Sequence, residues 1–372
     1  MRRDRFVDGT MCGANLNCGR NNDELSTEMS QLPLLGQDRY RMSGQKDGRN
    51  AGEVVRGTYH CGHPLVRPSR LTTVDRGGIG KDLSEGWCAN FAVGCTHGCP
   101  FCYVDAIHKR FGVCRHGDVV LRRWGSYILV PANMDEAISC TPWGRWRGKE
   151  VMMSSTHDPY LPELVGCTRK ILEASLPAGV RYCIQTRSPL VLRDMDLFTQ
   201  HADQVRIQVS IATMSRSFAS VIEPGAAPPE ARVRILREAK AAGLRTGVIV
   251  APVFPPTSAR RDVSSDMRDV ADALAGVKPD HVYGECLHLR GQNYRLVEEA
   301  IGEPLPEQNG WDASLSESFS EAFGKYDMKA MWWSERARPP RLRAGAAAPR
   351  VPFRSDCRSL SPRGAIPNVE TH

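Results

Sequence analysis

Apolar runs and amphipathic stretches alternate along the chain from residue 88 to residue 287. Short apolar runs rich in β-branched residues are typical of buried strands, and apolar positions that recur every three or four residues are typical of helices. Six strands are predicted, at 88–94, 150–155, 180–186, 205–211, 246–251 and 281–287. Five helices are predicted between them, at 103–111, 163–176, 193–201, 229–242 and 261–275.

This alternation determines the expected fold class. Nearly continuous apolar strands separated by helices predict an α/β protein with a parallel sheet that helices cover. Six such units suit a partial (β/α)6 barrel of TIM type, since the eight-unit barrel typically needs about 250 residues or more. A doubly wound open sheet is the alternative. In both architectures the active residues lie at the carboxyl ends of the strands.

The two ends of the chain differ from this central part. Residues 1–70 are rich in Gly, Asn, Asp and Arg without apolar periodicity, which predicts an irregular or disordered extension. Residues 333–372 are rich in Arg, Pro, Ala and Gly, which predicts a disordered basic tail. The core domain is therefore expected to span residues 71–332 and to end in a helix.

Charge follows the same division. Residues 1–70 hold 11 basic and 8 acidic residues, residues 333–372 hold 8 and 3, and the central part holds 30 and 31. The net charge of +7 therefore belongs to the ends, and the body is close to neutral.

The sequence contains no long apolar run, so we expect no membrane segment and no secretory signal, hence a cytoplasmic location. Cysteines in that reducing compartment serve metal binding or catalysis more often than disulfides.

Three of the 13 cysteines form a dense group directly after the first predicted strand. The sequence GCTHGCPFCYV places Cys95, Cys99 and Cys102 in a C-x3-C-x2-C pattern. Thiolates suit iron–sulfur clusters and zinc, and both usually take a fourth protein ligand. No clean second ligand pair follows, so three thiolates on a four-iron cluster would leave one iron open. Zinc completed by His97 is the alternative, although His97 lies between two ligands and should point outward.

The same pattern, with Phe101 before the last cysteine, resembles the signature of the radical SAM superfamily. The resemblance implies a [4Fe–4S] cluster on Cys95, Cys99 and Cys102, and S-adenosylmethionine bound to its open iron beside Phe101. Reductive cleavage of that cofactor would give a 5′-deoxyadenosyl radical, which abstracts hydrogen from a substrate. A reducing partner such as a flavodoxin or ferredoxin is implied as well.

Four further segments resemble the spore photoproduct lyase-like branch, and the resemblance covers roughly residues 85–300. They are MSSTHDPYLPE (153–163), QTRSPLVLRD (185–194), the E-P-G of the segment after the fourth strand, and GVIVAPVFP (247–255). The branch carries T-D-P-Y, T-K-S-P, E-P-G and V-A-P-x-x-P at these places. By position, the resemblance implies the following cofactor contacts: Ser154, Ser155, Thr156, Arg187, Ser188, Ser210, Val250 and Ala251.

Departures from the branch bear on the reaction. In photoproduct lyase a cysteine donates hydrogen from the position that Ser155 occupies here, and an O–H bond is much stronger than an S–H bond. Repair of DNA photoproducts is therefore disfavoured, unless Cys140 in the preceding loop replaces that cysteine. An additional His157 precedes Asp158, and Arg187 stands in place of a lysine. His157 and Asp158 are expected either to form an acid/base pair or, for Asp158, to cap a nearby helix.

The sequence thus predicts a radical SAM enzyme that abstracts hydrogen from an unknown substrate. One alternative is a DNA photoproduct lyase of the same fold, with nucleic acid as its partner. The other is a zinc-binding or cluster-binding interaction protein without turnover. Among the remaining cysteines, which are expected mainly in the core, Cys286 stands out because His288 follows it at the end of the sixth strand.

Overall fold

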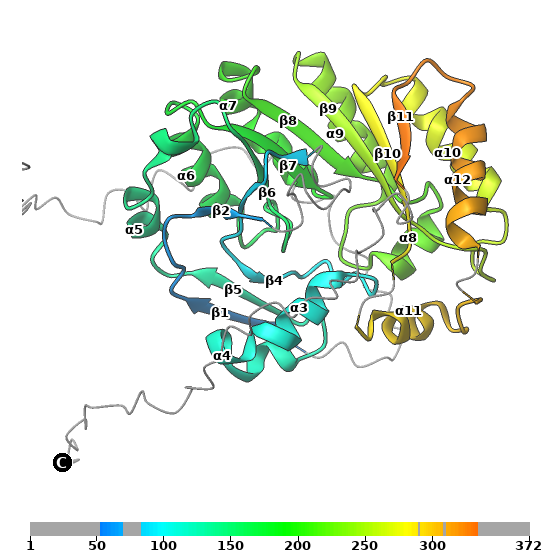
Figure 1. The fold of residues 1–372 in the computed structure, drawn as a ribbon, viewed down its shortest axis with the longest axis horizontal. Coiled ribbons are helices and arrows are strands. Elements are labelled where there is room, and N and C mark those ends of the chain that lie inside the picture. The colour runs from blue at the N-terminus through cyan, green and yellow to red at the C-terminus, as the bar shows by residue number, and fades with distance from the viewer. Residues whose placement is uncertain (1–52, 70–82, 289–290, 308–309, 334–372) are drawn as a thin grey trace, which may run out of the picture. The chain divides into compact units, whose positions relative to one another are not determined.

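The computed structural model describes residues 53–69, 83–288, 291–307 and 310–333. Their main feature is a curved sheet of eight strands (Figure 1). In spatial order these strands are β11 (Ala330–Trp333), β10 (His281–Cys286), β9 (Arg245–Val253), β8 (Val205–Ser210), β7 (Arg181–Thr186), β6 (Glu150–Met153), β3 (Trp87–Ala89) and β2 (Val66–Pro68).

Strand order and direction decide between the two expected architectures. Every neighbouring pair from β3 to β11 is parallel, and only β2 runs antiparallel to its neighbour β3. From β3 to β11 the spatial order follows the chain without the reversal that a doubly wound sheet requires. The edge strands β2 and β11 are not paired with each other, so the described strands form an open sheet. The predicted partial barrel is confirmed.

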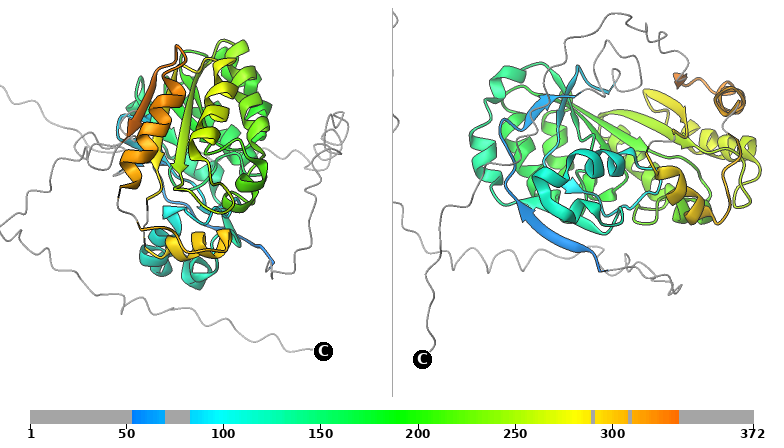
Figure 2. Two further views of the ribbon diagram at one scale, coloured as in Figure 1. Left: turned by 90° about the vertical axis from the view of Figure 1, so that its right-hand side faces the viewer. Right: turned by 60° about the horizontal axis from the view of Figure 1, so that its bottom comes forward.

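Helices cover the outer face of this sheet, as Figures 1 and 2 show. They are α6 (Val165–Ser175), α7 (Met195–Gln200), α9 (Pro229–Ala241) and α10 (Val263–Ala275), with α12 (Trp311–Phe323) packed against α10 and β10. The first turn of α9 carries Pro229, whose missing N–H costs nothing at that position. Val233, Leu236 and Ala239 of α9 are buried at helical spacing, which is why this helix was predictable.

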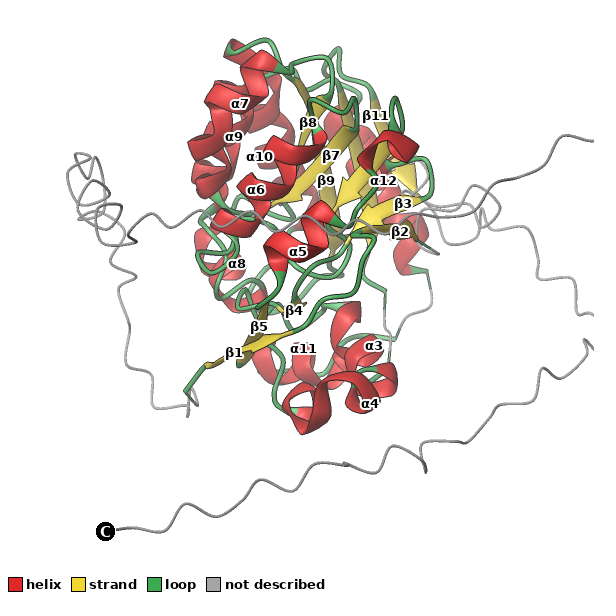
Figure 3. Cartoon of the chain, turned by 90° about the vertical axis from the view of Figure 1, so that its left-hand side faces the viewer, coloured by secondary structure: helices red, strands yellow, loops and turns green. Residues whose placement is uncertain are grey.

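The other described elements include a small sheet that lies at one edge of the large sheet (Figure 3). Its strands are, in spatial order, β1 (Val55–Tyr59), β5 (Tyr127–Pro131) and β4 (Val93–Gly94). Further helices are α3 (Tyr103–Phe111), α4 (Val113–His116), α5 (Met134–Ser139), α8 (Arg216–Ile222) and α11 (Asn293–Ile301). Short 3-10 helices occupy Gly117–Leu121, Trp143–Trp146 and Pro189–Asp194.

Three predictions about boundaries were wrong. The single strand predicted at 88–94 is two strands in two sheets, because the chain leaves β3 after Ala89 and pairs with β5 only at Val93 and Gly94. Strands β1 and β2 lie inside the predicted irregular extension. Trp333, assigned to the tail, ends β11 beside β10. The remainder of the predicted extension and tail lies outside the described residues.

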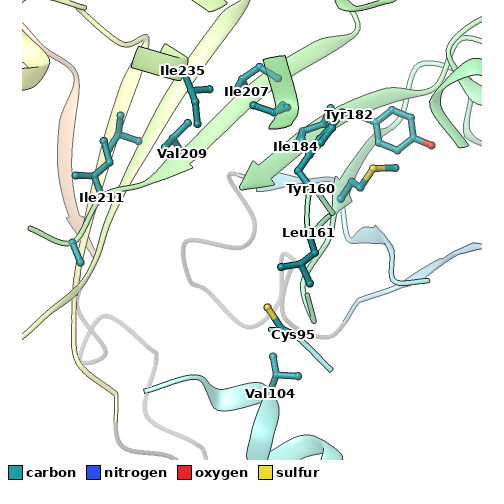
Figure 4. Packing of buried hydrophobic residues seen from close by; sticks show 14 of the residues in the cluster. Cys95, Val104, Tyr160, Leu161, Tyr182, Ile184, Ile207, Val209, Ile211 and Ile235 are labelled. Atoms are coloured by element: carbon teal, nitrogen blue, oxygen red, sulfur yellow. The ribbon is translucent and has the colours of Figure 1, made fainter. Parts of the chain in front are cut away.

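A continuous apolar core joins the sheet to its helices. Figure 4 shows Ile184, Ile207 and Val209 of neighbouring strands packed together, with Ile235 of α9 beside them. Cys95 lies at the lower end of this packing, between Leu161 and Val104. Within the described part of the chain, no helix is both long and apolar enough to span a lipid bilayer.

Gly94, directly before Cys95, shows how tightly this region is built. Its φ is +93°, and a Cβ there would lie 2.3 Å from the carbonyl oxygen of Tyr127. We expect Gly94→Ala to lower the free energy of unfolding by about 2 to 3 kcal/mol, because the backbone would have to move. Gly144→Ala, which meets no atom within 4 Å, is the control and should change it by less than about 0.5 kcal/mol. Equal urea denaturation midpoints for the two variants would contradict this account.

Candidate active site

The carboxyl ends of the parallel strands enclose a cavity of about 490 Å³. Residues 95–102 and helix α3 form one wall, and the ends of β6, β7, β8 and β9 form the floor and a second wall. The end of β10 and Trp333 of β11 form the third. The cavity therefore lies where the predicted architecture places catalytic residues.

The three motif cysteines face this cavity from one tight loop. The amide of Gly98 donates to the carbonyl of Cys95 over 3.3 Å, and the amide of Cys102 donates to the carbonyl of Cys99 over 3.0 Å. Gly98 has a φ of +61°, which allows the chain to reverse between the first two cysteines. Cys95 and Cys99 are buried, and Cys102 precedes the first turn of α3.

The chemistry of these thiols fits an iron–sulfur cluster. Burial raises the pKa of Cys95, of Cys99 and of Cys102 to about 12, so the three thiols stay protonated unless a positive group offsets the cost of their ionisation. A metal cluster supplies that positive charge, and the Arg187 guanidinium favours the ionised form of Cys99 further. Three soft ligands on one cavity wall are the donor set that such a cluster requires.

A single metal ion fits less well. Among the described residues, no three His, Cys, Asp or Glu side chains converge closely enough to hold one ion. A cubane cluster does not need such convergence, because each thiolate binds a different iron. His97 also differs from expectation: it is buried, and its Nδ1 lies 3.6 Å from Oδ2 of Asp158. The His97 ring therefore points toward the Asp158 carboxylate and not outward to solvent.

Asp158 joins the strand ends to one another. Its Oδ1 accepts hydrogen bonds from the hydroxyl of Thr186 (2.7 Å) and the amide of Tyr160 (2.9 Å). Its Oδ2 accepts from the amide of Arg187 over 2.6 Å. Helix α6 begins after Leu164 without a side-chain cap, so Asp158 does not cap it. Asp158 instead fixes the loop after β6 against the loop after β7.

His157 makes no hydrogen bond to Asp158. Its Nδ1 lies 3.2 Å from the hydroxyl of Thr156, and its ring meets Phe91 edge to face at 4.7 Å between centroids. Burial lowers the pKa of His157 to about 3, which keeps the imidazole neutral at physiological pH. The Nε2 atom of His157 has no hydrogen-bond partner among the described residues. The two neighbours in sequence thus have separate surroundings.

Ser155 is held in place from two neighbouring segments. The side chain of Asn90 accepts from the Ser155 amide and donates to its Oγ, each over 2.9 Å. The Tyr103 hydroxyl donates to the Ser155 carbonyl over 2.6 Å. The Sγ of Cys88, on β3, lies 3.8 Å from the Ser155 Oγ. Burial raises the pKa of Cys88, which therefore stays a neutral thiol directly behind the serine.

Arg187 links the cavity to a buried ion-pair network. Its Nε donates to Oε1 of Glu223 over 2.7 Å, and Nη1 of Arg232 lies 2.6 Å from Oε2 of the same carboxylate. Glu223 and Arg232 are almost fully buried. The Arg187 guanidinium also lies over the ring of Phe101, 5.9 Å from its centroid. Arg187 is thereby aimed at the cysteine loop.

The wall formed by β10 carries a hydrogen-bonded acid and imidazole. Oε1 of Glu285 lies 2.8 Å from Nε2 of His288, and the His288 ring packs edge to face on Trp333. Two residues of β9, 251 and 252, oppose Glu285 alone, and such a bulge redirects side chains at a sheet edge. Asn293 donates to the carbonyls of Phe101 (2.9 Å) and His288 (3.2 Å), which ties this wall to the cysteine loop.

Comparison with known proteins adds the family. Residues 89–283, just over half of the chain, match the sequence profile of the radical SAM superfamily. The chain belongs to the radical SAM superfamily. Its members use a [4Fe–4S] cluster and S-adenosylmethionine, so the predicted family and cofactors are confirmed.

Two relatives show how far the sequence similarity extends. The chain is 53% identical over 288 residues to the uncharacterised protein ORF301 of the Acidianus two-tailed virus, covering 77% of this chain and 96% of that protein. It is 28% identical over 205 residues to the uncharacterised protein MJ0683 of Methanocaldococcus jannaschii, covering 54% of this chain and 70% of that protein. Neither relative identifies a substrate.

Among solved structures, this radical SAM chain resembles spore photoproduct lyase. A complex of that enzyme with a dinucleoside spore photoproduct gives a TM-score of 0.51 at 17% identity, covering 70% of this chain and 79% of the lyase. A lyase variant with bound AdoMet and the same ligand gives 0.53 at 16% identity, covering 75% and 81%. At these identities the likeness establishes a shared fold.

The structure brings most of the nominated residues of this radical SAM chain together. Twelve line the cavity, namely Cys95, Cys99, Phe101, Cys102, Ser154, Ser155, Thr156, His157, Asp158, Arg187, Ser210 and Ala251. Cys140, Ser188 and Val250 do not. Cys140 is exposed at the end of α5, Ser188 accepts a hydrogen bond from the amide of Leu190, and Val250 is fully buried.

Some cavity residues were not nominated as site residues from the sequence. They include Tyr103, Gln185, Glu285 and Trp333. For Glu285 a signal existed, because Cys286 and His288 had marked the same strand end. Tyr103 directly follows Cys102 in the quoted cysteine segment, so its position beside the cysteines was visible in the sequence. Trp333 belongs to no motif, and only the folded chain places it at the cavity.

Proposed function

We propose that this protein is a radical SAM enzyme in which Cys95, Cys99 and Cys102 hold the [4Fe–4S] cluster. The observation that carries the proposal is the placement of three thiols, two of them on buried residues, on one wall of the cavity at the strand ends. When bound, the cluster and S-adenosylmethionine supply a carbon radical that abstracts hydrogen. The protein's contribution is to bind, orient and shield these reactants.

Side chains around the cavity suggest how the cofactor would be held. Arg187, fixed by Glu223, offers a guanidinium beside the cysteine loop for the carboxylate of S-adenosylmethionine. The loop after β6 offers the hydroxyls of Ser155 and Thr156, and β8 offers that of Ser210. Ala251 and Ile249 of β9 give an apolar surface for a flat ring. We infer that the β10 wall, to which no cofactor contact is assigned, faces the substrate.

Likeness of fold to spore photoproduct lyase favours DNA photoproduct repair as a second candidate function. Two features of this chain weigh against it. Ser155 occupies the position of the hydrogen-donating cysteine, and an alcohol gives up a hydrogen atom poorly. Cys140, the proposed replacement, is exposed and does not line the cavity. Cys286 does line it, so a thiol is present on the opposite wall for a different substrate.

The test of the proposed function is release of 5′-deoxyadenosine. The reconstituted protein, given dithionite and S-adenosylmethionine, should form it slowly without substrate and should leave a thymine photoproduct in DNA unrepaired. Cys140→Ala should behave like the native protein. Efficient repair that Cys140→Ala abolishes would show that the loop cysteine had taken over hydrogen donation. Absence of 5′-deoxyadenosine from a protein with full cluster content would contradict the radical mechanism itself.

A further inference from the structure

A strongly basic face lies next to the cysteine loop. The segment 109–123 contains five basic residues and one acidic residue, whereas the domain around it is nearly neutral. These residues belong to α3, α4 and the 3-10 helix Gly117–Leu121, which pack on one another at the edge of the molecule (Figures 1 and 3). We call the following exposed residues the basic face: Lys109, Arg110, Phe111, Arg115, Leu121 and Arg122.

Most of the charge on the basic face is not neutralised within the described residues. Lys109 pairs with Asp105, and the adjacent Arg123 pairs with Glu299. Arg110, Arg115 and Arg122 form no ion pair with any described residue. Positive charge at the end of α3 suits the helix dipole, but that effect does not account for Arg122, which follows a different element. The face therefore carries an excess of positive charge toward the solvent.

Apolar side chains are exposed within the same face. Phe111 is 62% exposed and Leu121 53% exposed, the two highest values among the large apolar side chains of the described residues. Exposed apolar side chains on a charged face are typical of a protein-binding surface. Single-stranded nucleic acid is usually held by several stacking aromatic rings, and this face offers only Phe111.

Helix α3 connects the basic face to the cysteine loop. Its first residue directly follows Cys102, and its nine residues span about 13 Å. Trp124, the residue after Arg123, lines the same cavity as the three cysteines. A redox centre docked on this face would therefore approach the cluster along the short length of α3. Arg110 and Phe111 of the basic face also line this cavity, so the face borders the cavity directly.

Resting on the proposed function, we infer that the basic face is the docking site of an acidic protein that carries single electrons, such as a flavodoxin. Charge complementarity selects an acidic partner and speeds its encounter, while Phe111 and Leu121 supply the apolar contact. In the step itself, the reduced flavin of the partner loses one electron and the [4Fe–4S] cluster gains it, with no proton exchanged at the face.

The test measures binding and cluster reduction separately. The reconstituted enzyme is mixed with a reduced, acidic flavodoxin, binding is followed by calorimetry, and reduction by the loss of the cluster's visible absorbance. We expect Arg115→Glu combined with Arg122→Glu to weaken binding and slow reduction at least about tenfold. Native binding should also weaken as salt rises from about 50 to about 300 mM. Neither arginine lines the cavity.

Matched controls make the result specific. Arg237→Glu makes the same charge change as either single substitution, Arg115→Glu or Arg122→Glu, at an exposed position of α9 on the outer face of the sheet. It should alter both quantities less than about twofold. Dithionite should reduce native and variant enzyme equally and should support equal 5′-deoxyadenosine release. Unchanged reduction by flavodoxin in the double variant would overturn the docking site. The docking site would also be overturned if the double variant lost binding to single-stranded DNA but kept native binding to flavodoxin. Failure of dithionite-driven release in all forms would instead refute the proposed function.

Discussion

Replacing Cys99 with alanine should abolish the iron–sulfur cluster and all radical chemistry. Anaerobic reconstitution of the native protein should give about four irons per chain and a brown colour. Cys99→Ala removes one of the three thiolates of the motif, so the cluster should fall to a small fraction of native content. Iron and sulfide analysis with electron paramagnetic resonance would measure the loss.

Another cysteine provides the matched control. Cys140 is exposed at the end of α5 and does not line the cavity, so Cys140→Ala should keep full iron content. Equal cluster content in Cys99→Ala and Cys140→Ala would refute the assignment of the motif cysteines. One zinc per colourless chain after anaerobic purification would favour the zinc-binding alternative.

Neutralising Glu223 should be the most destabilising polar change in this region. Glu223→Gln leaves Arg232, which is 1% exposed, without its carboxylate partner, and removes the anchor of Arg187. Breaking a buried ion pair from one side typically costs about 3 to 5 kcal/mol. Urea denaturation should show that loss. Glu230→Gln, which breaks an exposed ion pair with Arg216, should cost less than about 1 kcal/mol.

The same carboxylate predicts a pH dependence. Burial alone would raise the pKa of Glu223, but Arg232 and Arg187 outweigh it and hold this pKa below the ordinary value of 4.5. The stabilisation by ionised Glu223 is therefore fully present above pH 4.5 and is lost as the pH falls through the lowered pKa. The native protein should lose stability in that acidic range, and Glu223→Gln should lose less. Parallel acid-denaturation curves for the two proteins would contradict the role of the ion pair.

The cysteine motif and the central strands of the fold could be predicted from the sequence, because each is marked by a pattern in consecutive residues. The cysteine motif occupies eight consecutive residues, and the central strands are apolar runs that pack between helices, so both are visible without the structure. Strand β1 was not predicted, because only alternate residues of this strand are partly buried and its partner β5 lies about 70 residues away in the sequence. Such short edge elements gain their stability from pairing, which a single segment does not reveal.

The site was predictable to a similar extent. Residues at the ends of strands were nominated correctly as cavity residues where the motif ran on from the strand, as at Ser154 and Arg187. The link from Asn90 to Ser155 joins residues 65 positions apart, and the burial of His97 depends on Asp158 in another loop. The failure of Cys140 has the same origin, since closeness in sequence to β6 does not place it at the cavity.

The hydrogen bonds made by Asn293 affect when the cysteine loop can become fully ordered during synthesis of the chain. This side chain holds the carbonyl of Phe101, 192 residues earlier in the chain, and so fixes the loop that carries the cysteines. At about 5 to 20 residues per second, a ribosome needs roughly 10 to 40 s to pass from one to the other. During that interval the nascent cysteine loop lacks the hydrogen bond from Asn293. We therefore expect the proposed cluster to be inserted efficiently only after translation has passed α11.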